Sequence, residues 1–339
     1  MGKNNHYVPQ FYLRLFSNDL RKRSVGAYIF GANKFVKTAS IANMAQKDYL
    51  YGKDQELENI LIGLEGIWSK AINKLIVCGI DNICDETKLN ILYFIALSKT
   101  RTLKQAQQEN YQTDYFAKMK LTSIGVENIK GSFKREIPNL DHMYVAVKNI
   151  ELFTDLQWLM LENTTDAYFI TSDTPVCMYN KLYVVRSYDR GYGVGSGGII
   201  IFVPINPQKC LCLFDSVAYE PINRTIIKID TASKAHNINK LLCRNAYNNV
   251  FYNNKQKKSY LDKYIVMHKA YSIDNFVKPL VEPIYQIGDD NIRENFNLDF
   301  LRVRKEFLTV ELPYTLGGLL RPIVNKVLNS KSELKDEIK

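Results

Sequence analysis

Apolar side chains recur every three to four positions along residues 55–77, which is the spacing of one buried helix face. The apolar positions are Leu57, Ile60, Leu61, Leu64, Ile67, Trp68, Ala71, Ile72 and Leu75. This periodicity predicts a helix from Gln55 to Val77 that buries its apolar face. The next apolar stripe predicts a helix that begins near Asp85 and continues past Arg101, and a third helix is expected over Asp141–Asn163.

Two shorter elements precede these helices. Proline is well tolerated in the first turn of a helix, so Pro9 allows a short helix to begin near Val8. Apolar runs on both sides of Gly31–Asn33 predict a β-hairpin.

After Asn163 the pattern changes to short runs of β-branched and aromatic residues, separated by Pro, Gly and Asn. Strands are predicted at Ala167–Thr171, Val176–Tyr179, Leu182–Arg186, Ile199–Val203, Cys210–Phe214 and Val250–Tyr252. A helix over Ser233–Arg244 precedes the last of them. This order of elements predicts an α+β fold in which a helical layer, residues 55–163, packs beside a mostly antiparallel sheet.

Residues 1–255 are therefore interpreted as one α+β domain. Its three parts are the N-terminal helix and hairpin (1–54), the helical layer (55–163) and the sheet with its helix (164–255). Residues 256–339 show no clear period and are treated as a C-terminal extension whose role the sequence does not determine. Its last ten residues are expected to fray.

Composition narrows the class of protein. The chain has 339 residues, of which 46% are hydrophobic and 24% charged, and these proportions exclude disordered and coiled-coil proteins. The longest apolar runs, such as Ile199–Ile205, are far shorter than the roughly 20 residues that span a bilayer. The N-terminus also lacks the apolar segment of a signal peptide. A cytoplasmic protein without membrane contact is expected.

The net charge of +10 is unevenly distributed along the chain. Residues 1–53 carry nine basic and two acidic side chains, a net charge of +7. Clustered positive charge attracts phosphate backbones. It is equally typical of a solvated, lysine-rich surface. The charge therefore favours a nucleic acid or nucleotide as partner without excluding the second explanation.

The first group of candidate functional residues is His6, Gln10 and Arg14, in the segment HYVPQFYLR. Gln10 and Arg14 are four residues apart and share one face of a helix. Histidine supplies a general acid or base, glutamine an orienting amide and arginine an anion clamp. The alternative is a packing motif, in which the aromatic residues belong to the core and His6 caps the backbone.

Two further groups of polar residues are candidates for the same site. Asp173 ends a predicted strand in ITSDTP, where it is a candidate base or metal ligand or, alternatively, part of an Asx turn before Pro175. On the predicted helices, Glu58 and Glu65 share one face. Arg101 ends an apolar helix and needs a carboxylate partner if it is buried. Such an ion pair is also compatible with a purely structural role.

The sequence contains no standard catalytic or zinc-binding motif. Its motifs instead resemble those of a bacterial family of unknown function, DUF family 4238. The resemblance covers about Asn5 to Tyr252 and rests on HYVPQFYLRLF, KDYLYG, ELENILIGLEGIWSKAINKL, LYFIALSKTRT, FITSDTPV, IIIFVPINPQKCLCL and HNINKLLCRNAYNNVFY. The chain departs from the family in having SDTP for SDNP, and Leu103 where the family often has proline.

The resemblance implies a role in defence against phages, because members of the family occur among bacterial and prophage-borne defence genes. The family's motif positions in this chain are His6, Gln10, Arg14, Glu58, Glu65, Arg101 and Asp173. Polar residues of these types, recurring in separate elements, are what a shared site would need. We therefore expect the fold to bring them together.

Two functional hypotheses follow. In the first, the protein is an intracellular anti-phage effector, a nuclease or another phosphoryl-group enzyme, that acts on nucleic acid or a nucleotide. Its catalytic candidates are His6, Asp173 and Gln10, and its binding candidates are Arg14, Arg101, Glu58 and Glu65. A divalent metal is a candidate cofactor whose ligands are unknown. In the second, the protein is a non-enzymatic sensor or toxin that binds a phage protein or nucleic acid. The sequence leaves the choice between them open, together with the substrate, the trigger and the oligomeric state.

Overall fold

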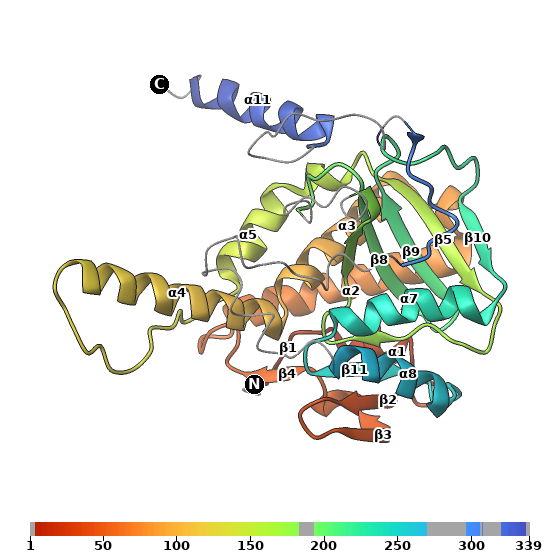
Figure 1. The fold of residues 1–339 in the computed structure, drawn as a ribbon, viewed down its shortest axis with the longest axis horizontal. Helices are drawn as coiled ribbons and strands as arrows, with labels where there is room; N and C mark the ends of the chain where they lie inside the picture. Colours follow the sequence, from red (N-terminus) through yellow and green to blue (C-terminus); the bar gives the residue numbers. More distant parts are fainter. Residues whose placement is uncertain (1–3, 183–192, 270–295, 306, 308–319, 337–339) are drawn as a thin grey trace.

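A five-stranded sheet of order β10-β5-β9-β8-β7 forms the centre of the molecule (Figure 1). The computed structural model describes residues 4–182, 193–269, 296–305, 307 and 320–336. The strands are β5 (Gln157–Asn163), β7 (Cys177–Asn180), β8 (Ile199–Asn206), β9 (Lys209–Phe214) and β10 (Ile226–Ile229). Neighbouring strands pair antiparallel, except that β10 and β5 are parallel.

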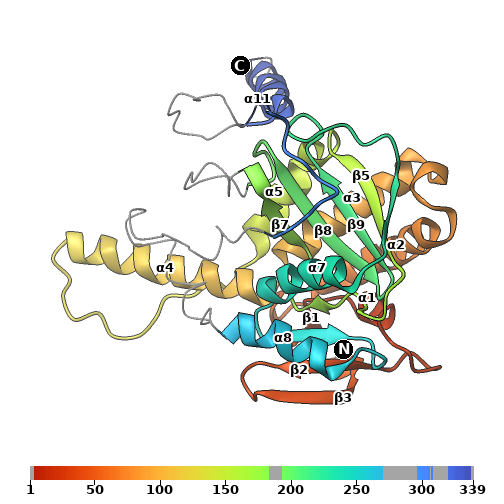
Figure 2. The same cartoon turned by 45° about the vertical axis from the view of Figure 1, so that its right-hand side comes forward.

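Helices cover both faces of this sheet (Figures 1 and 2). They are α2 (Glu56–Cys78) and α3 (Asp85–Thr100) on one face and α7 (Ala232–Asn245) on the other, with α8 (Lys258–Lys269) packed against α7. Ile201 and Val203 of β8 pack with the first pair, whereas Ile200 and Phe202 pack on the side of α7. Because both faces are buried, the central strands are apolar along most of their length.

Two smaller sheets lie at the N-terminal side of the molecule. The first has the order β3-β2-β11-β6 and contains β2 (Ser24–Ile29), β3 (Lys34–Ser40), β6 (Thr171–Ser172) and β11 (Asn249–Tyr252). The second pairs β1 (Asn4–His6) with β4 (Gln46–Asp48).

The short helix α1 (Gln10–Arg14) docks between these sheets and the helical layer by its aromatic face. The Tyr12 hydroxyl donates to the Pro204 carbonyl at 2.7 Å and lies 2.8 Å from the Thr171 hydroxyl. The Phe11 and Tyr12 rings both contact Phe94 of α3. Burial of this face holds a helix that is too short to be stable alone.

The remaining helices lie around this body. The helix α4 (Leu103–Ser123) projects as an arm in both views (Figures 1 and 2). The others in the described residues are α5 (Leu140–Lys148), α11 (Pro322–Asp336) and the 3₁₀ helices η1 (Ile41–Asn43), η2 (Ile80–Asn82) and η3 (Ile150–Phe153). None of the helices in the described ranges is both long and apolar enough to cross a membrane.

The structure confirms the predicted α+β class but corrects the third predicted helix. The segment Asp141–Asn163 is helical only in its first part, because α5 ends at Lys148 and residues 157–163 form β5 between β9 and β10. Its residues Trp158–Leu161 are consecutively apolar and pack on both faces of the sheet. A continuous apolar run of this length fits a buried strand and a buried helix equally well.

The helix that was predicted to continue past Arg101 ends at Thr100. Thr102 caps a new helix, α4, by accepting a hydrogen bond from the Gln105 amide at 3.2 Å. The Asn139 side chain donates to the carbonyls of Thr100 and Thr102 at 2.7 and 2.9 Å. These contacts satisfy backbone groups at the two helix ends, which makes the break stable.

Other differences concern the short strands and the C-terminal residues. Of the predicted strand Ala167–Thr171, only Thr171 is in a strand, and residues 183–186 of another prediction lie outside the described residues. Neither β10 nor α8 was predicted, and α11 extends into the segment expected to fray. Phe296, Leu298 and Leu301 are buried in the core that contains α7, so residues beyond 255 help to form it.

The apolar face of α2 is buried only in part. Leu61, Trp68 and Leu75 are buried, Leu57 and Leu64 are half-buried, and the predicted positions Ile60 and Ile67 are 60% and 47% exposed. This difference provides a test of the packing, because adjacent residues of similar size lie in opposite environments.

Leu61→Ala is expected to lower the free energy of unfolding by about 2–5 kcal/mol, because it leaves a cavity in the core. Ile60→Ala on the same helix is expected to change it by less than about 0.5 kcal/mol. Urea unfolding of both variants measures the difference, and equal effects would contradict the packing described for α2.

Candidate functional site

His6, Gln10 and Arg14 form a row of hydrogen bonds along the start of the chain. Arg14 Nη2 donates to Gln10 Oε1 at 3.1 Å, and Gln10 Nε2 lies 3.3 and 3.5 Å from the two ring nitrogens of His6. His6 Nε2 lies 3.0 Å from the Ala42 carbonyl oxygen. Because a carbonyl oxygen only accepts, this network assigns the His6 proton to Nε2 and leaves Nδ1 as the acceptor that faces Gln10.

The row runs from a half-buried histidine to an exposed arginine. Burial lowers the pKa of His6 below its usual value, although the hydrogen bond to Ala42 opposes this effect. The ring is therefore neutral at pH 7 and retains one acceptor nitrogen. The guanidinium of Arg14 uses a single donor for Gln10, so most of its N–H groups remain available to a ligand.

A buried ion pair lies beside this row. Arg101 Nη2 donates to Glu65 Oε1 at 2.6 Å, and the Arg101 side chain is completely buried, whereas that of Glu65 is 22% exposed. Arg101 also donates to the backbone carbonyls of His6 and Tyr7, at 3.3 and 3.4 Å. Arg101 thus ties the segment between β1 and α1 to the middle of α2 and to the C-terminal end of α3.

Glu58 belongs to the same cluster. Burial raises the pKa of Glu58, and the nearby charge of Arg101 opposes this rise. The Asn5 side chain and the His6 amide lie near its carboxylate and also lower its pKa. The Tyr51 hydroxyl completes the network by donating to the Arg101 carbonyl at 3.0 Å. Six of the seven residues singled out from the sequence therefore lie in one connected cluster, which we call the His6 cluster: His6, Gln10, Arg14, Glu58, Glu65 and Arg101.

The buried part of the His6 cluster does not favour an anion. Glu65 and Glu58 together balance or exceed the positive charge of Arg101, so attraction of a phosphate is left to the exposed Arg14. Two buried polar atoms, Arg101 Nη1 and Gln46 Oε1, have no hydrogen-bond partner among the described residues. No group of three or more His, Cys, Asp or Glu side chains in the described residues is arranged to hold a metal ion.

Asp173, the seventh residue, is engaged elsewhere. Its carboxylate accepts hydrogen bonds from the backbone amides of Tyr247, Asn248 and Asn249, at 2.8, 2.6 and 3.2 Å. Burial raises the pKa of Asp173 to about 6, against the opposing effect of the three amides. No hydrogen bond or ion pair in the described residues connects it to the His6 cluster.

Tyr7 lies between Asp173 and the His6 cluster. Its carbonyl oxygen accepts from Arg101. Burial raises the pKa of its hydroxyl, and the charge of Asp173 adds to this rise. Asp173 is therefore a close electrostatic neighbour of the cluster, while its hydrogen bonds hold the turn between α7 and β11.

Sequence reasoning missed the residues that complete the cluster, namely Asn5, Tyr51 and Gln46. Gln46 faces His6 through the antiparallel pairing of β1 and β4. Strands of three residues carry too little periodicity to reveal their pairing. Asn5 could have been suspected, since it directly precedes the HYVPQ motif.

Comparison with known proteins gives one result. A family described as "Protein of unknown function (DUF4238)" matches residues 4–256. No curated protein and no solved structure matches the chain. The match spans both small sheets and the central sheet, and it ends just before α8.

Removal of the buried guanidinium should destabilise the fold. Arg101→Ala is expected to lower the free energy of unfolding by about 3–5 kcal/mol, because Glu65 and two carbonyls lose their partner inside the protein. Arg135→Ala is the matched control: it removes an exposed ion pair with Asp141, and it should cost at most about 1 kcal/mol. Thermal and urea unfolding measure both, and a small effect of Arg101→Ala would contradict the tethering role.

The raised pKa of Asp173 predicts an unusual pH dependence. The folded state binds the Asp173 proton with a pKa of about 6, against about 3.8 for an ordinary aspartate, so this residue contributes stability at acidic pH that is lost as the pH rises from about 4 to about 6. The difference in unfolding free energy between the parent chain and Asp173→Asn should therefore shrink by about 2–3 kcal/mol over this range. Urea unfolding at several pH values measures it. Parallel curves for the two proteins would show that Asp173 does not titrate in this way.

Proposed function

We propose that this chain, which belongs to the DUF4238 family, is a cytoplasmic anti-phage defence protein that acts on the phosphate groups of a nucleic acid or nucleotide at the His6 cluster. The observation that carries the proposal is the row Arg14–Gln10–His6. It joins an exposed cation to a neutral, half-buried imidazole. The defence role itself rests on the family resemblance.

The row provides the groups that phosphoryl chemistry needs. Arg14 would bind a phosphate oxygen, since guanidinium matches phosphate geometry. His6 would act as general base through Nδ1, after substrate displaces the long contact from Gln10. Gln10 would orient the nucleophile. The lowered pKa of His6 keeps the ring in the form that accepts a proton at pH 7.

The buried residues would position the imidazole. Arg101 binds the backbone carbonyl of His6, and the ring itself lies 3.0 Å from the Ala42 carbonyl, so the residue is held at two points. In this proposal Glu65 balances the charge of Arg101, and Asp173 supports the neighbouring turn. Neither would contact substrate.

Charge around the row supports a polyanionic partner. Arg21, Lys22 and Arg23 follow α1 and are exposed, as is Lys47 on β4. Exposed cations next to a phosphate site strengthen the binding of nucleic acid in a salt-dependent way, independent of base sequence.

A second candidate function is non-enzymatic binding, as a sensor or toxin that recognises nucleic acid or a phage protein. It is favoured by the fact that both ring nitrogens of His6 contact groups of the protein itself. If this arrangement persists with ligand bound, Arg14 would bind phosphate without any turnover.

The test uses the purified chain with labelled RNA, single-stranded DNA, double-stranded DNA and nucleotides, with and without Mg²⁺. His6→Ala is expected to reduce turnover by about 10²–10⁴-fold while binding is retained, and Arg14→Ala is expected to weaken binding. Lys228→Ala, which removes an exposed cation from β10, is the matched control and should change neither.

The pH profile distinguishes the role of His6. Because the pKa of His6 is lowered, turnover should rise with pH, with a midpoint below about pH 6.5. Binding that depends on Arg14 without any turnover would favour the second candidate. Absence of binding to every nucleic acid and nucleotide would contradict the first proposal and would leave the second candidate only as the recognition of a phage protein.

A further inference from the structure

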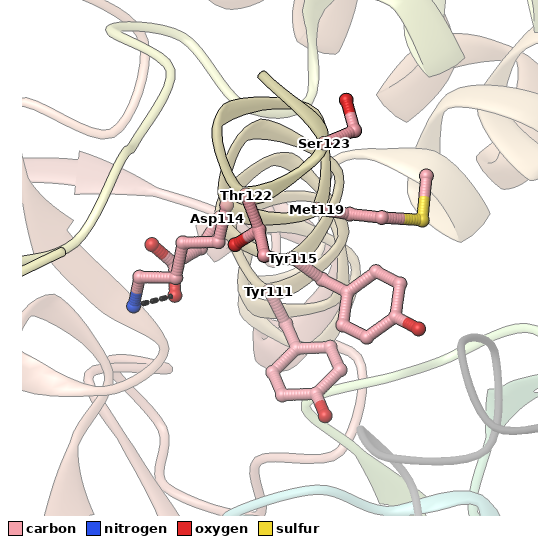
Figure 3. A pocket seen from close by; sticks show the side chains of 7 residues that line it. Tyr111, Asp114, Tyr115, Met119, Thr122 and Ser123 are labelled. Carbon is pink, nitrogen blue, oxygen red and sulfur yellow. Dashed lines mark hydrogen bonds and ion pairs between the residues drawn. The ribbon is translucent and has the colours of Figure 1, made fainter. Parts of the chain in front are cut away.

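The arm formed by α4 exposes an apolar stripe. Tyr115, Phe116 and Met119 are 41%, 53% and 53% exposed. Figure 3 shows that Tyr111, Tyr115 and Met119 leave the helix on one side and Asp114 on the other. A hollow of about 560 Å³ beside this face is lined, in the described residues, by α4 alone. Apolar side chains concentrated on a projecting helix are typical of an interaction surface.

The opposite side of α4 is occupied by the arm's own return segment, residues 124–138. The Phe133 amide donates to Asp114 Oδ1 at 2.9 Å, and the Arg135 amide donates to Asn110 Oδ1 at 3.1 Å. These contacts fix the return segment on the side of Asn110 and Asp114. Among the described residues, no other helix or strand packs extensively against α4, and Tyr115 and Met119 on the stripe are exposed.

We propose that the stripe of α4 binds the same stripe of a second copy of this chain, with the two helices antiparallel. This inference is independent of the proposed function. The flank of the stripe carries an ion pair, in which Lys118 Nζ lies 2.8 Å from Asp114 Oδ2. In an antiparallel pair related by a two-fold axis near Tyr115, Lys118 of each copy lies beside Asp114 of the other. Opposite charges would then meet across the interface, which favours the antiparallel orientation.

The apolar residues are self-complementary in the same arrangement. Tyr111, Tyr115 and Met119 follow one another at intervals of four residues, so they lie in one row along the helix. A two-fold axis at Tyr115 places the two Tyr115 rings together and places Tyr111 of each copy against Met119 of the other. Aromatic pairs and sulfur–aromatic contacts of this kind are favourable, and a two-fold interface uses one surface patch twice.

The size of the contact sets its strength. An interface limited to two helix faces lies at the low end of specific interfaces, below about 1,200 Å² of buried surface. We therefore expect a reversible dimer with a dissociation constant in the micromolar range.

Sedimentation of the full chain between about 1 and 100 μM tests the proposal, with a concentration-dependent shift from monomer to dimer as the expected result. Met119→Lys should raise the dissociation constant at least about tenfold, because it buries a charge in the stripe. Ile124→Lys is the matched control: Ile124 is 69% exposed but lies beyond the end of α4 and off the stripe. It should leave association unchanged.

Two further variants test the antiparallel register. Asp114→Lys should weaken the dimer, and the double variant Asp114→Lys with Lys118→Asp should restore it. In a background in which the exposed Cys78 and Cys84 are serine, Tyr115→Cys should be joined to a second chain by a short bis-maleimide, whereas Lys120→Cys should not. A monomer at every concentration, or a dimer that Met119→Lys leaves intact, would overturn the proposal.

Discussion

The ion pair between Arg101 and Glu65 is the interaction on which the N-terminal half of the structure depends. A fully buried guanidinium is costly unless its charge is balanced and its donors are used. Glu65 supplies the charge, and the carbonyls of His6 and Tyr7 accept two further hydrogen bonds. Arg101 thus joins three segments that are far apart in the sequence: the start of the chain, α2 and the end of α3.

The same contacts explain why the candidate site is rigid on one side and open on the other. Arg101 binds the His6 carbonyl, and the His6 ring lies next to Gln10, which accepts a hydrogen bond from the exposed Arg14. Aromatic burial of α1 against α3 and β8 adds a second anchor. A base and a cation presented on a fixed backbone are suited to a small, charged group such as phosphate.

Asp173 stabilises the turn between α7 and β11. Its hydrogen bonds hold the turn that leads into β11, and β11 pairs with both β2 and β6. Its charge raises the pKa of the Tyr7 hydroxyl, and the Tyr7 carbonyl accepts a hydrogen bond from Arg101. The strand-end aspartate therefore stabilises the small sheet, and Tyr7 lies next to both Asp173 and Arg101.

Periodicity in the sequence determined the long helix α2 and the helix α7, and short apolar runs between Pro, Gly and Asn determined the hairpin β2–β3 and the strands β8 and β9. The chemical types of the residues and the resemblance to the family identified six residues of one cluster. The tertiary structure alone decided that residues 157–163 form the central strand β5, that α3 ends at Thr100, and that Asp173 binds backbone amides. Residues 157–163 form a strand because helices from other parts of the chain cover both faces of the sheet. Asp173 binds backbone amides because residues about 75 positions later lie beside it. Such contacts join residues far apart in the chain, and local spacing does not encode them.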